Sequence, residues 1–352
     1  MASRNAPQLL AADCAAVRAR AWRIPRIAVV ILLALATSGC YYLQAARGQL
    51  RVMSARQPID KVIARPATSD TLKSQLTRAR RIRDFASREL GLPDNASYKS
   101  YADIGRRYVV WNVVATPEFS VEPRTWCFPI AGCVSYRGYF SEKAANAFAE
   151  QRRKAGDDVV VGGVPAYSTL GRIADPLLNT VTGYAELDLA ALIFHELAHQ
   201  VAYRADDSSW NEAFATAVEE AGVARYAATF ADPALLGRWQ QRRRLRVALS
   251  ATITRAREDL ARLYRRRLAP EALRQAKQQR LAELAAAIRV MEKEQGMSSG
   301  FGAWIDAGLN NAHLASVATY YERVPHFEEL LKNRCGDYLP CLYVLAKMEQ
   351  VR

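Results

Sequence analysis

The chain has 352 residues and a mass of 39.2 kDa, which allows one large domain or two modest ones. Half of the residues are hydrophobic and 24% are charged, so a wholly disordered or collagen-like chain is excluded. The formal net charge is +14, a balance that suits nucleic acid, an anionic membrane surface or simple solubility. Histidine is scarce, and two of the four histidines lie in one pentapeptide.

The first forty residues have the pattern of an export signal. Arginines cluster over residues 18–26, an uncharged run covers residues 27–36, and small residues at 37–39 lead to Cys40. An ending on cysteine resembles the bacterial lipobox, whose cysteine is acylated. The alternative is an uncleaved membrane anchor, but the apolar run is shorter than the ~20 residues that span a bilayer. We therefore predict a signal peptide over residues 1–39, lipidation of Cys40, and anchoring in the bacterial cell envelope facing the periplasm.

Four further cysteines fall into two local pairs. Cys127 and Cys133 are six residues apart, and so are Cys335 and Cys341. An oxidising envelope favours disulfides, although four cysteines allow three pairings that sequence alone does not distinguish. We expect the two local pairs. A zinc site built from the four thiolates is the alternative, but the spacing differs from that of zinc knuckles.

The first half of the chain mixes helical and extended patterns. After a tether that becomes a helix over residues 41–68, we expect a helix over residues 71–90, capped by Ser69 or Asp70. A further helix is expected over residues 142–155. Runs rich in Tyr, Val and Trp between turn residues indicate strands at residues 98–104, 108–115, 133–140, 157–161 and 166–169.

From about residue 186 the pattern becomes helical. Apolar residues recur at helical spacing at Leu189, Leu192, Ile193, Leu197 and Val201. Further helices are expected over residues 211–229, in a hairpin over residues 231–294, and over residues 310–331. The sequence therefore predicts an α+β fold: an α+β region over residues 40–230, a basic helical hairpin over residues 231–300, and a C-terminal helical segment over residues 301–352 that completes the first region.

The hairpin is strongly basic, with 16 Lys and Arg residues against 7 Asp and Glu over residues 231–294. The three-arginine tracts at residues 242–244 and 265–267 would suit the phosphates of a nucleic acid. No recognised nucleic-acid module appears, however, and an exported protein rarely meets nucleic acid. We predict a solvated helix face next to an anionic membrane, and no nucleic-acid partner.

Residues 195–199 form an HExxH motif, His195-Glu196-Leu197-Ala198-His199. On a helix, positions i and i+4 share a face, so both imidazoles can reach one Zn²⁺ at ~2.0–2.1 Å. Glu196 then points to the open side of the metal and can take a proton from the attacking water. The alternative is chance, but a chain of this composition would show such a pattern in roughly 0.3% of cases.

A zinc site needs a third protein ligand. The other two histidines lie beyond residue 310, which argues against the HExxHxxGxxH arrangement. Glu212 is the better candidate, because a short loop at residues 205–210 lets the next helix fold back antiparallel. The alternative for Glu212 is a first-turn carboxylate favoured by the helix dipole. Thr216 or Glu219, on the same face, could hold a ligand histidine through its other ring nitrogen.

Further motifs accompany the pentapeptide. They are residues 195–200, Asn211-Glu212, residues 215–222, Cys40 with Tyr42, Gln44, Gly48 and Gln49, residues 126–133, 136–140 and 175–179, and Asn310-Asn311-Ala312 with Tyr320. With these motifs the chain resembles the gluzincin clan of zinc metallopeptidases. More narrowly, it resembles a bacterial family of predicted zinc aminopeptidases that are mostly lipoproteins.

The resemblance implies a zincin-like core and adds expectations about the rest of the site. Gluzincins often stabilise the tetrahedral oxyanion with a Tyr or His from far downstream, which makes Tyr320 the first candidate and Tyr321 and His313 the alternatives. An extended substrate normally lies along an edge strand before the active-site helix, and residues 164–169 are the candidate here.

The predicted function is hydrolysis of peptide bonds by one Zn²⁺ per chain, held by His195, His199 and Glu212, with Glu196 as the base. The resemblance makes the enzyme an aminopeptidase acting on peptide substrates. An endopeptidase is one alternative. A lipid-anchored scaffold without catalysis, which binds a partner or a membrane through the basic hairpin, is the other.

Overall fold

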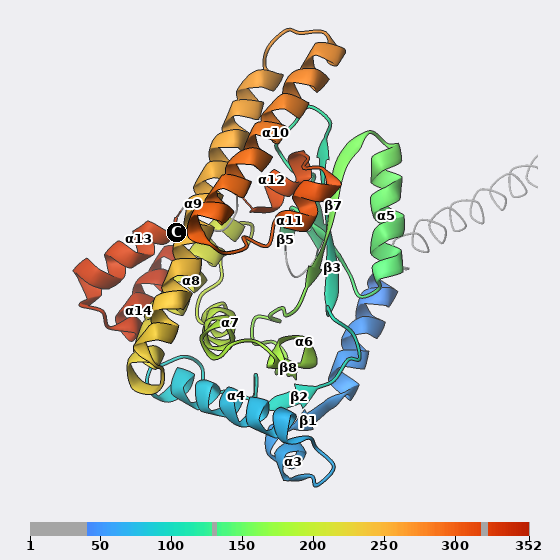
Figure 1. Ribbon diagram of the computed structural model, residues 1–352. Coiled ribbons are helices and arrows are strands. Elements are labelled where there is room, and N and C mark those ends of the chain that lie inside the picture. Colours follow the sequence, from blue (N-terminus) through green and yellow to red (C-terminus); the bar gives the residue numbers. More distant parts are fainter. Residues whose placement is uncertain (1–40, 129–131, 318–322, 352) are drawn as a thin grey trace, which may run out of the picture. The chain divides into compact units, whose positions relative to one another are not determined.

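The computed structural model describes residues 41–128, 132–317 and 323–351, and Figure 1 shows how their helices and strands are arranged. The chain divides into two compact units, residues 1–51 and 52–352. In the first unit, the described residues 41–51 are helical. The predicted signal segment and Cys40 lie outside the described residues. The second unit holds both sheets and helices, so the predicted α+β class is confirmed.

Helix α4 supplies one wall of the main core. The second unit begins with β1 (Arg56–Pro58), α3 (Ile59–Ala64) and α4 (Asp70–Arg88). Of the two predicted caps the structure uses Ser69, whose hydroxyl accepts from the backbone N–H of Leu72. Leu76, Ile82 and Phe85 lie on one face of α4 and are buried in the core.

Seven more strands form small sheets. They are β2 (Ser100–Ala102), β3 (Val110–Pro117), β4 (Trp126–Phe128), β5 (Gly132–Val134), β6 (Arg137–Tyr139), β7 (Asp157–Val164) and β8 (Leu177–Leu178). Their orders are β1-β2-β8, β6-β3-β7 and β4-β5. The long antiparallel pair β3 and β7 lies between α5 (Glu142–Lys154) and α12 (Asn311–Val317), which packs on Val114 and Val160 (Figure 1).

The predicted strands differ from the observed ones in extent. Residues 133–140 form two strands in different sheets, because a bend at residues 135–136 separates β5 from β6. Strand β7 continues through Gly162 and Gly163, and residues 166–169 hold no strand. A Cβ at Gly163 would lie 2.3 Å from the ring of Tyr108, so the glycine provides room for this ring rather than ending the strand.

Two helices form the centre of the core. After α6 (Asn179–Thr182) come α7 (Glu186–Ala198) and α8 (Ser208–Phe230). Phe194 of α7 and Phe214 and Tyr226 of α8 are fully buried. The helices approach closely at Gly222, where a Cβ would lie 2.8 Å from the side chains of Leu90 and Phe194. A residue with a side chain at position 222 would push α7 and α8 apart.

The C-terminal half of the chain is helical. It contains α9 (Pro233–Tyr264), α10 (Pro270–Gln295), α11 (Gly302–Ala307), α12, α13 (Val324–Glu329), a π-helical turn (Leu330–Arg334) and α14 (Leu339–Gln350). Helices α9 and α10 form a hairpin with its own apolar seam, which includes Leu249, Ile253, Leu260, Leu281, Leu284 and Ile288. Pro270 lies in the first turn of α10, where its missing N–H costs no helical hydrogen bond.

Both local cysteine pairs form disulfides. Cys127–Cys133 joins β4 to β5, and Cys335–Cys341 ties the start of α14 to the preceding turn. The expected pairing is confirmed, and a four-thiolate zinc site is excluded by it. Among the described residues, no helix combines the length and the hydropathy needed to cross a bilayer.

Arg83 holds the segment between α4 and β2. Its side chain is 1% exposed, and its guanidinium donates to the carbonyl oxygens of Ser97 at 2.8 Å, Pro93 at 2.7 Å and Asn95 at 3.1 Å. The hydrogen bond to Ser97 is buried and the other two are partly buried. Because a carbonyl shielded from water and without a donor costs free energy, Arg83 fixes the path of the chain up to Tyr98.

We predict that Arg83→Met lowers the free energy of unfolding by about 3 kcal/mol, because one buried and two partly buried carbonyls lose the guanidinium donor. Arg80→Met is the matched control on the same helix, since Arg80 is exposed and pairs only with the exposed Asp60. Its loss should stay below about 1 kcal/mol. Urea unfolding of both variants measures the difference, and equal losses would contradict the role of Arg83.

Candidate metal centre

Three donor atoms converge where α7 ends and α8 begins. Nε2 of His195 lies 3.2 Å from Nε2 of His199 and 3.2 Å from Oε2 of Glu212. Nε2 of His199 lies 3.8 Å from Oε1 of Glu212. All three donors are within 4.8 Å of one another, so the described chain brings together the three predicted ligands in a group that could hold a metal ion.

The helix ends place the two histidines. His195 lies in the last turn of α7, and His199 is the C-cap residue of that helix with φ −59° and ψ −21°. Because these angles are helical, both imidazoles remain on one face of the helix although α7 ends at Ala198. Helix α8 begins at Ser208, three residues before the predicted position 211, so Glu212 lies in the second turn rather than the first.

The loop between α7 and α8 is fixed by side chains at the start of α8. Asp207 caps this helix by accepting from the backbone N–H of Trp210 at 3.1 Å. The amide of Asn211 donates to the carbonyl of Arg204 at 2.7 Å and accepts from its N–H at 2.6 Å. These bonds set where α8 begins and therefore where Glu212 faces the histidines.

Glu219 orients the first histidine. Its Oε2 lies 3.1 Å from Nδ1 of His195. Glu219 follows Glu212 by about two turns on the same face of α8. Of the two predicted partners, Thr216 and Glu219, the structure places the glutamate at the ring. An acceptor at Nδ1 leaves Nε2 turned toward the other donors, as in metal sites where an outer carboxylate fixes the histidine tautomer.

Charge within the cluster is balanced by these contacts. Burial alone would lower the pKa of His195, but hydrogen bonds with Glu212 and Glu219 outweigh burial and hold this pKa well above its ordinary value. Burial and the neighbouring His195 lower the pKa of His199 to about 4. Burial opposes ionisation of Glu212, but the two histidines keep its pKa below its usual range. These shifts favour a protonated His195 beside an ionised Glu212 and a neutral His199.

Glu196 stands apart from the donor group. It follows His195 on α7, and burial raises the pKa of its carboxyl to about 7. Its surroundings include Tyr98, which is 3% exposed and adopts a φ of 62° that tyrosine rarely takes. The hydroxyl of Tyr98 has no hydrogen-bond partner among the described residues. Sequence reasoning missed Tyr98, because no local pattern signals its approach to α7.

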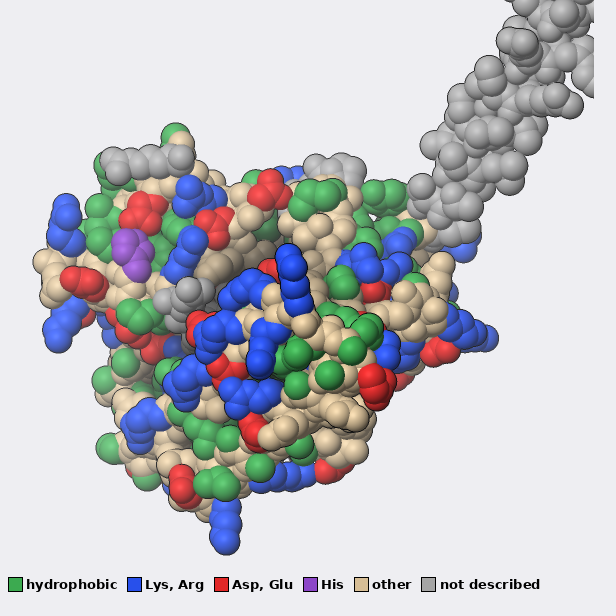
Figure 2. Space-filling view, turned by 90° about the horizontal axis from the view of Figure 1, so that it is seen from above, with side chains coloured by type: hydrophobic (Ala, Val, Ile, Leu, Met, Phe, Trp, Pro, Cys, Tyr) green, Lys and Arg blue, Asp and Glu red, His purple; other side chains and the backbone are tan. Residues whose placement is uncertain are grey.

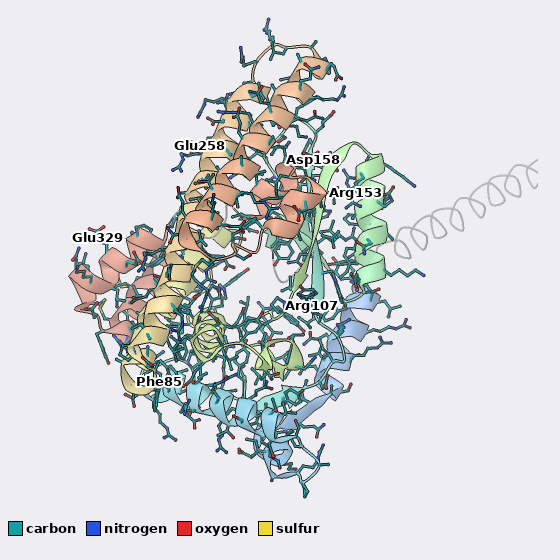
Figure 3. All side chains as sticks on the ribbon, viewed as in Figure 1. Phe85, Arg107, Arg153, Asp158, Glu258 and Glu329 are labelled. Atoms are coloured by element: carbon teal, nitrogen blue, oxygen red, sulfur yellow. A yellow bond between two sulfur atoms is a disulfide. The ribbon has the colours of Figure 1, made fainter. Side chains whose placement is uncertain are left out.

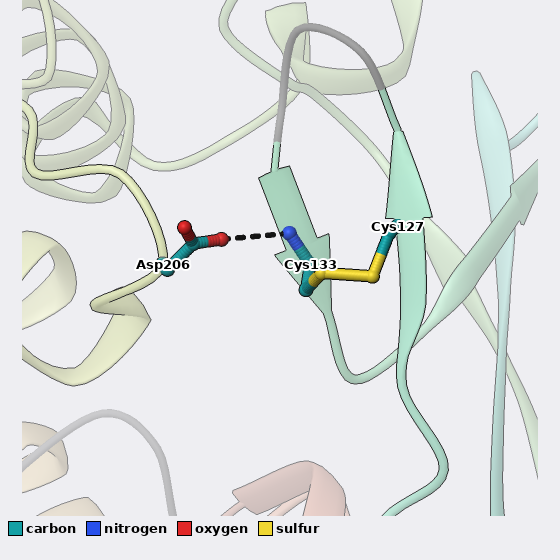
Figure 4. The surroundings of a disulfide bond; sticks show 3 residues. All are labelled: Cys127, Cys133 and Asp206. Carbon is teal, nitrogen blue, oxygen red and sulfur yellow. Dashed lines mark hydrogen bonds between the residues drawn. A yellow bond between two sulfur atoms is a disulfide. The ribbon is translucent and has the colours of Figure 1, made fainter.

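Two further groups border the site. The ring of Tyr203 lies 6.5 Å from that of His199. Tyr203 follows His199 by four residues, a separation that could have suggested this neighbour. Asp206, in the same loop, accepts from the backbone N–H of Cys133 at 2.8 Å (Figure 4). A Cβ at Gly132 would lie 2.4 Å from Oδ1 of Asp206, so the glycine permits this contact. The disulfide-bonded pair β4-β5 is thereby attached to the loop that follows the HExxH motif.

Of the three candidate oxyanion donors, the structure describes His313 alone and does not bring it into this cluster. The ring of His313 packs against that of Trp304 and bonds to Asn310, among apolar residues of the hairpin. Burial lowers the pKa of His313 to about 4. His313 therefore belongs to the packing of α12 on the hairpin. Tyr320 and Tyr321 lie outside the described residues.

The residues present fit zinc. Two imidazole nitrogens and a carboxylate oxygen are a donor set that catalytic zinc sites use, and they leave a coordination position for water or substrate. Nδ1 of His199 is buried and, within the described part of the chain, has no hydrogen-bond partner. Nε2 is thus the nitrogen of His199 that faces other polar atoms, and these are the other two donors.

Fold and site together define an α+β protein with a His, His, Glu cluster suited to a metal ion. The family described as "Putative aminopeptidase" matches residues 40–351, and the chain belongs to this family. The description suggests peptidase activity. No curated protein and no solved structure matches the chain.

We predict graded effects on zinc affinity, measured by competition with a chromophoric chelator. Glu212→Ala should weaken zinc binding by more than about 100-fold, because only two protein ligands, the imidazoles, remain. Glu219→Gln should weaken it by roughly 10-fold to 100-fold, because the carboxylate that orients His195 is lost. Glu258→Gln is the control, since Glu258 is exposed on the hairpin (Figure 3). Unchanged affinity in Glu212→Ala would show that Glu212 is not a ligand.

Proposed function

We propose that the chain is a zinc-dependent aminopeptidase of the bacterial cell envelope. The observation that carries this proposal is the convergence of His195, His199 and Glu212 within 4.8 Å, with Glu219 on the outer nitrogen of His195. Membership of the aminopeptidase family supports peptide bonds as the substrate. The HExxH motif supports a hydrolytic reaction over a purely structural metal site.

The three ligands would hold the metal, and Glu196 would move the proton. Bound zinc supplies a Lewis acid that polarises a carbonyl and lowers the pKa of water toward ~7. Glu196 follows a ligand in sequence but is not part of the donor group, so its carboxylate is available to accept the proton of the attacking water. The same group then donates this proton to the leaving amine.

A strand edge is available for an extended substrate. Strand β7 is the last strand in the order β6-β3-β7, and it ends at Val164, where the predicted substrate segment at residues 164–169 begins. Asn310 donates to the carbonyl of Val159 at 3.2 Å and so covers part of this edge. We therefore move the proposed substrate strand from residues 164–169 to the C-terminal half of β7.

Two further parts of the proposal rest on sequence. Tyr320 is the proposed oxyanion donor, and kcat of Tyr320→Phe should fall by roughly 10²–10³ with zinc retained. Lipidation of Cys40 is the proposed means of anchoring in the envelope. Mass spectrometry of the mature N-terminus tests it, and an unmodified Cys40 that follows residues 1–39 would contradict it.

The role of Glu196 has a separable test. Glu196→Gln should keep zinc at wild-type stoichiometry but lose at least about 10²-fold in peptide hydrolysis, because an amide cannot accept the proton. Glu186→Gln, on the same helix outside the donor group, is the control and should retain activity. Zinc content by elemental analysis and digestion of a peptide library are the two measurements. Loss of zinc from Glu196→Gln would make Glu196 a ligand instead of a base.

Aminopeptidase and endopeptidase activity are distinguished by the substrate N-terminus. An aminopeptidase must bind a free α-ammonium group, so N-acetylation of a peptide should abolish its cleavage. An endopeptidase would cleave the free and the acetylated peptide at the same internal bond. Mass spectrometry of paired peptides measures this. If wild-type protein binds zinc but cleaves neither peptide, the scaffold without catalysis replaces both enzymes.

A further inference from the structure

Eight basic residues of the hairpin are paired with carboxylates of neighbouring elements or of the hairpin itself. These pairs are Arg242 with Asp188, Arg243 with Glu220, Arg257 with Glu122, Arg262 and Arg280 with Asp259, Arg274 with Glu118, Lys277 with Asp158, and Arg289 with Asp306. Their charge is used within the protein. Others, including Arg238, Arg244 and Arg246 on α9, are exposed and have no ion pair with a described residue.

The tip of the hairpin, residues 265–268, brings three consecutive arginines of this second kind together. Arg265, Arg266 and Arg267 are exposed, and none has an ion pair with another described residue. Leu268 beside them is 39% exposed. Figure 2 looks down on this end of the hairpin and shows Lys and Arg side chains gathered next to hydrophobic ones. The tip is therefore a small convex surface with three free cations and one apolar side chain.

Side-chain contacts join the two arms of the hairpin to the rest of the protein below the tip. Lys277 pairs with Asp158 of β7 at 2.6 Å and donates to the carbonyl of Glu118 at 2.9 Å. The hydroxyl of Tyr264 donates to Asn311 at 2.9 Å. Asp158 lies where the hairpin meets the sheet (Figure 3). These contacts attach both arms of the hairpin to neighbouring elements below the tip.

We propose that the hairpin tip is a docking surface for anionic phospholipid headgroups. Guanidinium groups bind phosphate oxygens through paired hydrogen bonds, and each basic residue near an anionic bilayer contributes to binding. Leu268 favours a lipid surface over a nucleic acid, because an apolar side chain gains by entering the headgroup boundary. This docking surface is separate from the metal centre.

The test uses the full chain with Cys14→Ser, Cys40→Ser and Ala269→Cys, labelled at residue 269 with a fluorophore that spin-labelled lipids quench. The label reports contact of the tip even where residues 27–36 hold the chain on a vesicle. Vesicles contain either phosphatidylcholine alone or phosphatidylcholine with phosphatidylglycerol. The tip variant is R265E/R266E/R267E. The matched control is R238E/R244E/R246E, which changes the same charge at three exposed positions elsewhere on α9.

We expect quenching on phosphatidylglycerol vesicles and none on phosphatidylcholine alone. The tip variant should need at least tenfold more anionic lipid for half-maximal quenching, and the control should stay within about threefold of wild type. Salt at 0.5 M should remove the quenching. The proposal is overturned by equal quenching on both vesicles or by a tip variant that matches wild type. It is also overturned if duplex RNA or polyglutamate displaces the tip at concentrations below those of the lipid.

Discussion

The placement of one carboxylate between a half-buried and a buried imidazole is the constraint on which the rest of the structure depends. Glu212 reaches His195 and His199 because α8 folds back on α7 in the antiparallel direction, and this direction also brings Glu219 to the other side of His195. Buried charges are tolerated only when paired, so α7 and α8 cannot slide by a turn without leaving a carboxylate or an imidazolium unpaired. The close contact at Gly222 sets the separation of the two helices.

Other elements hold this pair in register. Arg83 of α4 donates hydrogen bonds to backbone carbonyls that precede Tyr98, and Tyr98 lies near Glu196. Asn211 ties the loop after the HExxH motif to α8, and Asp206 ties the same loop to a disulfide-bonded strand pair. The position of the candidate base is therefore determined by segments from several distant parts of the chain. Such support is what a preorganised site requires.

The metal donors could be predicted from the sequence because their geometry is local. The spacing of His195 and His199 fixes them on one helix face, and a short loop limits where Glu212 can go. Both disulfides were predictable because each closes a short segment. The strand limits were not, since β7 continues through Gly163 by pairing with Trp111 of β3, and the missing side chain leaves room for Tyr108, which is distant in sequence. The surroundings of His313 and Tyr98 could not be predicted either, because they come from elements that no local sequence pattern brings together.

The central claim is that one zinc ion is held by two imidazoles and one carboxylate. X-ray absorption spectroscopy of the zinc-loaded chain tests this ligand set most directly. The account predicts scattering from two histidine rings and from oxygen ligands only, with Zn–N distances of ~2.0–2.1 Å, and loss of one oxygen ligand in Glu212→Ala. Sulfur scattering at ~2.3 Å, or a third histidine ring, would contradict the account.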